Sequence, residues 1–83
     1  MLEKSFSYSS NISWVKIENE VFVFNEISKD VYLFKNKERK VWDLIKCNLS
    51  KECLFALMEK ESVASEEVLQ ILDMFYKNGL IEK

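Results

Sequence analysis

Residues 31–45, VYLFKNKERKVWDLI, contain the change of pattern that decides the fold. Val31-Tyr32-Leu33-Phe34 is a run of large apolar residues, of the types that favour β-strands. From residue 36 the apolar residues recur at the spacing of an amphipathic helix, at Val41, Trp42, Leu44 and Ile45. Asn36 is the expected helix N-cap, and Glu38 follows in the first turn, where acidic side chains are favoured. The sequence therefore predicts a strand that passes almost directly into a helix.

Two more apolar runs lie upstream, one at residues 14–17 and the other at Val21-Phe22-Val23-Phe24. Short polar stretches at residues 18–20 and 28–30 separate the runs, which predicts a three-stranded antiparallel meander over residues 12–34. The runs are continuous rather than alternating. Such runs are typical of strands that contact something on both faces.

Two further helices are expected downstream. Ser50 is a good N-cap for the first of them, whose apolar positions are Cys53, Leu54, Leu57 and Met58. Ser65 opens the next helix, and Gly79 ends it because glycine adopts the left-handed conformation without strain. Leu80 and Ile81 are then free to fold back onto the core. The expected fold class is α+β, with the order β-β-β-α-α-α and helices of about 10, 10 and 14 residues.

The length of 83 residues corresponds to a single domain. Residues 1–11 are rich in serine and form an N-terminal tail, in which Phe6 and Tyr8 are compatible with a short strand. A loose tail is the alternative, because chain termini are often poorly ordered. The domain itself is expected to span residues 12–83.

The composition argues against catalysis and against a metal or organic cofactor. The chain has no His and only two Cys, so it lacks the commonest general base and a plausible set of zinc ligands. Its single Gly excludes a glycine-rich phosphate loop. Cys47 and Cys53 are expected to be small core residues of a protein in a reducing cytoplasm. The chain also lacks an apolar run of about 18 residues, so no membrane span is expected.

The charge balance argues against nucleic acid as a partner. Twelve basic residues stand against fourteen acidic ones, for a formal net charge of −2. The single basic run consists of Lys35, Lys37, Arg39 and Lys40. These four side chains are expected to be solvated surface, or else to meet acidic residues of a bound peptide.

The third strand of the meander, residues 31–34, is an edge strand and admits two interpretations. In the first, Tyr32 and Phe34 face the core while Val31 and Leu33 lie under a helix. In the second, this apolar edge pairs with an extended peptide, which would add main-chain hydrogen bonds to the sheet.

The third helix can form the wall of such a groove. Val68, Leu72 and Phe75 define its core-facing centre, with Leu69 and Tyr76 on one flank and Ile71 and Met74 on the other. Its apolar arc is wider than one core face requires, although a thin core in so small a domain is a sufficient explanation.

Over residues 13–82 the sequence resembles the PqqD-like leader-peptide-binding domains, also called RiPP recognition elements. The resemblance rests on the order of the elements and on three short motifs, Tyr32-Leu33-Phe34, Val41-Trp42-x-Leu44 and Leu72-x-x-Phe75-x-x-x-Gly79-Leu80. The chain departs from the family at two places. Phe34-Lys35 replaces a common Leu-Asn pair, and Lys46-Cys47-Asn48 occupies the region where the family often has Asp-Gly.

The resemblance implies a winged-helix-like, non-catalytic, cytoplasmic protein. Such a protein binds the leader segment of a ribosomally synthesised precursor peptide as a strand added beside the third strand. It then presents the peptide to a maturation enzyme, such as a radical SAM enzyme, a cyclase of lasso-peptide type or a leader peptidase. The residues expected to bind the leader are Val31, Tyr32, Leu33, Phe34, Leu69, Leu72, Phe75 and Tyr76.

Two other functions remain open at the level of sequence. One is a winged-helix module that binds DNA and regulates transcription, although residues 65–67 are acidic where a helix contacting phosphates would be neutral or basic. The other is a structural subunit of a larger complex that uses the same strand edge.

Overall fold

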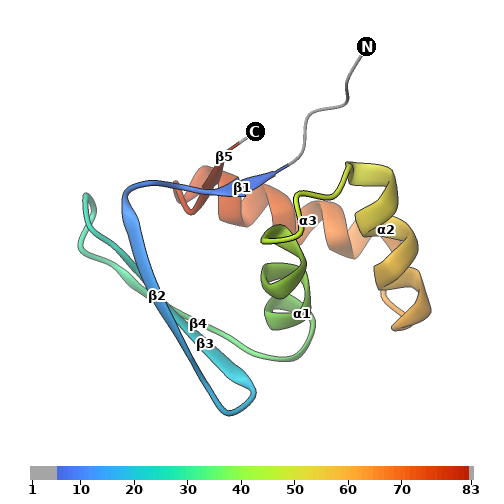
Figure 1. Cartoon of the computed structure of the whole chain (residues 1–83), viewed down its shortest axis with the longest axis horizontal. Coiled ribbons are helices and arrows are strands. Elements are labelled where there is room, and N and C mark those ends of the chain that lie inside the picture. Colours follow the sequence, from blue (N-terminus) through green and yellow to red (C-terminus); the bar gives the residue numbers. More distant parts are fainter. Residues whose placement is uncertain (1–5, 83) are drawn as a thin grey trace.

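The computed structural model describes residues 6–82 of the chain (Figure 1). The elements in chain order are β1 (Ser7–Tyr8), β2 (Ile12–Ile17), β3 (Glu20–Asn25), β4 (Val31–Phe34), α1 (Asn36–Ile45), α2 (Lys51–Lys60), α3 (Ser65–Lys77) and β5 (Ile81–Glu82). A three-stranded sheet lies at one side of the molecule, and the three helices lie on one side of it, with α1 against the sheet and α2 packed on α1 and α3. The α+β class and the order of its principal elements are as predicted.

The main sheet is an antiparallel meander of order β2-β3-β4, so β4 is an edge strand as expected. A second sheet pairs β1 with β5 through Ser7↔Glu82 and Tyr8↔Ile81. The sequence suggested a short strand near Tyr8 but did not predict this pairing. Of the two interpretations of the N-terminal tail, the strand is therefore the one seen at Ser7–Tyr8. The remainder of the tail, residues 1–5, lies outside the described residues.

The helix termini follow local chemistry in two of three cases. The Ser50 hydroxyl accepts a hydrogen bond from the Cys53 amide at 3.3 Å, which caps α2 as predicted. Gly79 has φ of 72°, and its N–H and that of Leu80 donate to the carbonyls of Tyr76 and Phe75 in a Schellman motif. The prediction for Asn36 was wrong. Lys35 is the N-cap of α1 without a side-chain cap, and Asn36 is the first residue of the helix, with a left-handed φ of 52°.

Both cysteines are exposed, so the prediction that they are core residues was wrong. Cys47 lies in the turn after α1, because this helix ends at Ile45 instead of extending the apolar face. Cys53 lies in the first turn of α2, whose buried residues are Leu54 and Met58 alone. Leu57 is also partly exposed, so the buried face of α2 is narrower than its sequence suggests.

The core is centred on Trp42 of α1, which is 0% exposed. Its indole ring lies 5.6 Å from the ring of Phe34 and 5.2 Å from the ring of Phe75, measured between centroids. On its other side it meets Tyr8 at 4.7 Å and Trp14 at 5.9 Å. One side chain thus joins β1, β2, β4 and α3 to α1.

Asn25, at the end of β3, is the only polar residue classed as buried among residues 6–82. Its Oδ1 accepts hydrogen bonds from the amides of Ile27 (2.9 Å) and Ser28 (3.1 Å), which shapes the turn into β4. Its Nδ2 donates to the carbonyl of Asn78 at 2.8 Å. One amide side chain therefore ties the β3–β4 turn to the C-terminal end of α3.

We expect Asn25→Ala to lower the free energy of unfolding by about 1–3 kcal/mol, because it leaves buried backbone groups without partners. Chemical denaturation, monitored by circular dichroism, measures the change in unfolding free energy. Asn19→Ala, in the exposed turn between β2 and β3, is the matched control and should alter stability by less than about 0.5 kcal/mol. Equal effects of the two substitutions would contradict the role given to Asn25.

Tyr8 makes stability depend on pH in the alkaline range. Burial, assisted by the negative charge of Asp43, raises the pKa of the Tyr8 phenol from 10.0 to about 12. The hydroxyl donates to the Trp42 carbonyl at 2.7 Å, a bond that only the protonated phenol can make. Its stabilising contribution is therefore complete below pH 10 and is lost as the pH rises towards 12.

We expect Tyr8→Phe to be less stable than the natural protein at pH 8, and the gap in unfolding free energy to narrow as the pH rises from 10 towards 12. Urea titrations of both proteins across this range measure the gap. The two proteins differ only in the Tyr8 hydroxyl, so the difference between them isolates Tyr8. A gap that stays constant with pH would contradict this assignment.

Candidate functional site

The β4 edge is bordered by β3 on one side only. The register pairs Phe34 with Val21 and Tyr32 with Val23, and no described strand pairs with the other side of β4. The Asn25 amide donates to the Asp30 carbonyl, so the odd-numbered residues of β3 point their backbone groups toward β4. By alternation, Tyr32 and Phe34 bond to β3, whereas the N–H and C=O groups of Val31 and Leu33 point to the free edge.

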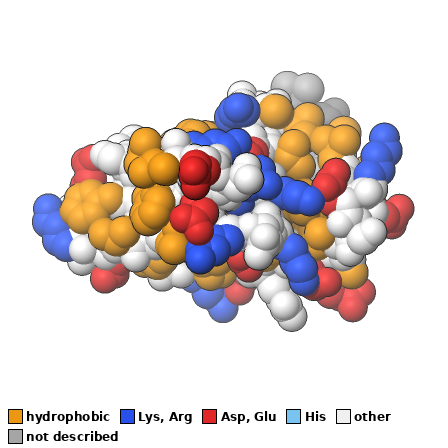
Figure 2. Space-filling model, turned by 90° about the horizontal axis from the view of Figure 1, so that it is seen from below, with side chains coloured by type: hydrophobic (Ala, Val, Ile, Leu, Met, Phe, Trp, Pro, Cys, Tyr) orange, Lys and Arg blue, Asp and Glu red, His pale blue; other side chains and the backbone are white. Residues whose placement is uncertain are grey.

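The side chains of β4 alternate between the two faces of the sheet. Phe34 is 4% exposed and Tyr32 is half-buried, so both face the core. Val31 and Leu33 are 65% and 45% exposed on the outer face, where Figure 2 shows hydrophobic side chains gathered over the sheet. The interpretation that placed Tyr32 and Phe34 inward was therefore right, but its placement of Val31 and Leu33 under a helix was wrong.

Contacts between β4 and α3 are aromatic and polar. The rings of Phe34 and Phe75 lie 4.7 Å apart between centroids. The Tyr32 hydroxyl donates to Oδ1 of Asn78 at 3.1 Å, just beyond the end of α3. The inner face of β4 is thereby held against α3 while its backbone edge stays open.

The flank of α3 that adjoins β4 carries Glu67, Ile71 and Met74. At 100° per residue these positions share a side of the helix with Asn78, the partner of Tyr32. Just after the end of β4, a hollow of about 240 Å³ lies between the first turn of α1 and α3. It is lined by Asn36, Lys37, Glu38, Glu67, Gln70 and Ile71.

Leu69 and Tyr76 lie on the opposite flank of α3. They line a separate hollow of about 120 Å³ together with Phe6 and Lys51, and no residue of β4 contributes to it. Leu72 and Phe75 are core residues, 4% and 0% exposed. The structure therefore brings together Val31 to Phe34, and it packs Phe75 against Phe34 inside the core. Leu69 and Tyr76 lie at the separate hollow, away from β4.

Ile71 and Met74, on the other flank of α3, were not among the residues predicted to line the groove. Gln70 and Asn78 carried no signal that pointed to a site, because an isolated amide on a helix is ordinary surface. Which flank of α3 meets β4 depends on the packing of Phe75 against Phe34, a contact between segments far apart in sequence.

The four basic residues of the predicted run are each paired with an acid of the same chain. Lys37 bonds to Glu67, and this hydrogen bond raises the pKa of Lys37. Lys40 bonds to Glu61 at 2.6 Å, which lowers the pKa of Glu61. The other two pairs are Lys35–Glu20 at 3.2 Å and Arg39–Asp43 at 3.2 Å.

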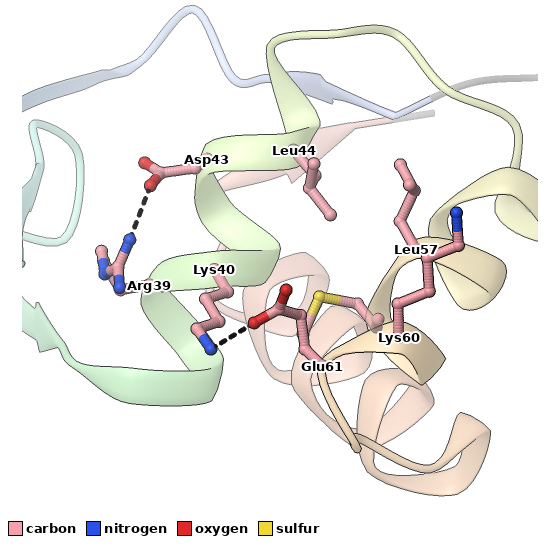
Figure 3. A pocket seen from close by; sticks show the side chains of 8 residues that line it. Arg39, Lys40, Asp43, Leu44, Leu57, Lys60 and Glu61 are labelled. Atoms are coloured by element: carbon pink, nitrogen blue, oxygen red, sulfur yellow. Dashed lines mark hydrogen bonds and ion pairs between the residues drawn. The ribbon is translucent and has the colours of Figure 1, made fainter.

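A hollow of about 380 Å³ lies between α1 and α2 (Figure 3). Leu44, Leu57 and Met58 supply its apolar wall, and the Lys40–Glu61 ion pair crosses between the two elements. No residue of β4 lines it. Within residues 6–82, no cluster of three or more His, Cys, Asp or Glu side chains is arranged to hold a metal ion.

Comparison with solved structures finds one informative likeness. The chain matches the structure of TbiB1 in complex with the TbiA(beta) leader peptide, with a TM-score of 0.80. The chain has the fold of TbiB1. The match covers 92% of this chain and 94% of TbiB1, at 17% sequence identity, so the likeness to TbiB1 concerns the fold. No family model matches the sequence, and no curated protein matches it.

The helices of the described region offer no candidate for a membrane span, since none combines sufficient length with sufficient apolar character.

Proposed function

We propose that this chain is a non-catalytic adaptor that binds the leader segment of a ribosomally synthesised precursor peptide as a strand added to β4. The observation that carries the proposal is the open edge of β4 beside α3, in the fold of a protein solved with a leader peptide. The N–H and C=O groups of Val31 and Leu33 supply the pairing sites. A strand paired with β4 would form hydrogen bonds with these N–H and C=O groups in a defined register. Side-chain contacts alone would leave the same groups bonded to water.

In this proposal the leader lies between β4 and the flank of α3 that carries Ile71 and Met74. Alternate leader side chains point to the two faces of the extended sheet. Those on the inner face meet Ile71 and Met74, and those on the outer face lie beside Val31 and Leu33. The Lys37–Glu67 pair stands at one end of this path, where a charged leader residue would have to exchange partners with it.

The adaptor role, rather than an enzymatic one, is supported by the chemistry of the chain. It contains no His, and both cysteines are exposed and unbridged. Free thiols are ordinary in a reducing cytoplasm, which is where we place the protein. The bound precursor would then be processed by a separate enzyme, such as a radical SAM enzyme, a lasso-type cyclase or a leader peptidase.

The alternative of a winged-helix DNA-binding module receives less support from the surface charge. The formal net charge is −2, and the four residues of the basic run are paired with carboxylates of the same chain. Counterion release on DNA needs several cations free to meet phosphates. Nanomolar binding of a DNA duplex at physiological salt would favour this alternative over the adaptor.

We expect Leu33→Pro to weaken leader binding at least about tenfold while the fold survives. Proline removes the Leu33 N–H, which points to the free edge and takes no part in pairing with β3. Isothermal titration calorimetry measures the affinity, with leader peptides from precursor genes that neighbour the gene of this protein. Circular dichroism of the variant is the control for folding.

The same titration, followed through backbone amide chemical shifts, tests the binding mode. Strand addition should shift the amides of Val31 and Leu33 more than those of Tyr32 and Phe34, whose N–H groups already bond to β3. If the leader binds tightly while the amides of residues 31–34 stay unchanged, strand addition at β4 is refuted.

A matched pair of substitutions tests which flank of α3 faces the leader. We expect Met74→Ala to weaken binding by about 1–3 kcal/mol, as for an anchor residue, and Tyr76→Ala to leave it within about 0.5 kcal/mol. Both replace a large side chain on the same helix by alanine. The reverse result would move the groove to the hollow lined by Phe6 and Leu69.

A further inference from the structure

The hollow just beyond β4 lies on the path proposed for the leader. Ile71 lines this hollow and also stands on the flank of α3 that adjoins β4. β4 ends at Phe34 and α1 begins at Asn36, so Lys35 alone separates the free strand edge from the first turn of α1, which forms the other wall. A leader strand that continues past Phe34 between β4 and α3 therefore meets this hollow.

The hollow has room for one long side chain. Its volume of about 240 Å³ is about eight times the volume that a water molecule takes up in the liquid, which is enough for the side chain of a lysine or an arginine. Ile71 supplies an apolar wall for the methylene stem of such a side chain. Asn36 and Gln70 add side-chain amides, whose oxygens accept hydrogen bonds from an ammonium or guanidinium group.

The charged groups of the hollow leave one carboxylate without a cation. The charged residues of its lining are Lys37, Glu38 and Glu67. Lys37 of α1 and Glu67 of α3 are bonded to each other. Glu38 forms no ion pair with any other residue of the described chain. The hollow is therefore net negative even while its own ion pair is intact.

The neighbouring basic residues do not neutralise Glu38. The rest of the basic run is bonded to acids elsewhere, in the pairs Lys35–Glu20, Arg39–Asp43 and Lys40–Glu61. The pKa of Lys37 is raised first by its hydrogen bond to Glu67 and by the charge of Glu67, and then by the negative charge of Glu38. Glu38 thus lies close to the ion pair without being its partner.

This arrangement treats the two signs of charge differently. A basic leader side chain finds in Glu38 a partner outside the Lys37–Glu67 pair. An acidic leader side chain finds only Lys37, the single cation among the described residues that line the hollow. It can bond to Lys37 only by displacing Glu67, and it then stands beside two like charges, which repel it.

We propose that this hollow is a specificity site of the leader groove and takes a lysine or arginine side chain of the leader. The charged group of that side chain meets Glu38, and its stem lies on Ile71. The inference rests on the proposed function, because it requires a leader strand on β4. It assigns the leader a basic residue just outside the stretch that pairs with Val31 and Leu33, on the side of Phe34.

Isothermal titration calorimetry with two sets of leader peptides tests the proposal. The peptides derive from the precursor gene that neighbours the gene of this protein, and each residue in turn is replaced by Lys in one set and by Glu in the other. At one position of the leader we expect the Lys peptide to bind about fivefold more tightly than the Glu peptide. Glu38→Gln should remove most of this preference, and Glu38→Lys should reverse it.

Glu66→Gln is the matched control. Glu66 is also an acidic residue in the first turn of a helix, but it is exposed and does not line the hollow. Its replacement removes the same charge and the same favourable interaction with a helix N-terminus, so the preference for Lys should stay as in the natural protein. Denaturation of the three variants, monitored by circular dichroism, checks that the fold persists.

The outcomes separate this inference from the proposed function. If the leader peptides bind but no preference for Lys over Glu depends on Glu38, the specificity site is refuted and the leader-binding role stands. A Glu38-dependent preference for Glu over Lys would refute the site as well. If none of the natural or substituted leader peptides binds, the proposed function itself fails, and the specificity site fails with it.

Discussion

The packing of the buried Trp42 side chain is the interaction on which the rest of the structure depends. Its indole is fully buried and meets the rings of Tyr8, Trp14, Phe34 and Phe75. Removing a large buried aromatic side chain typically costs roughly 3–5 kcal/mol, a large part of the stability of a domain this small. Because those four rings belong to four different elements, this one residue sets the position of α1 relative to both sheets and α3.

The position of Trp42 also determines which surfaces remain open. With α1 and α3 on the inner face of the sheet, Phe34 is buried and the backbone edge of β4 faces solvent. Asn25 holds that strand in place by fastening the preceding turn to the end of α3.

Several features were predictable because their causes are local. The strand run at 31–34, the Ser50 cap and the Gly79 terminus depend on residues close in sequence. The wrong predictions for Asn36 and Cys47 also had a local cause, which was the exact position of the two ends of α1. Asn36 does not cap α1, because the helix begins one residue earlier than its apolar pattern implied. Cys47 fell outside the core because α1 ends at Ile45, so the helical period no longer applied to it.

Periodicity and turn chemistry were sufficient for the order of the main elements, for the edge position of β4 and for the wide apolar arc of α3. Only the packed chain decided which flank of α3 meets β4, that Ser7–Tyr8 pairs with Ile81–Glu82, and that the basic run is neutralised by Glu20, Asp43, Glu61 and Glu67. The reason is physical. Periodicity shows how wide the apolar surface of a helix or strand is, whereas the direction in which each flank points follows from contacts between residues far apart in sequence.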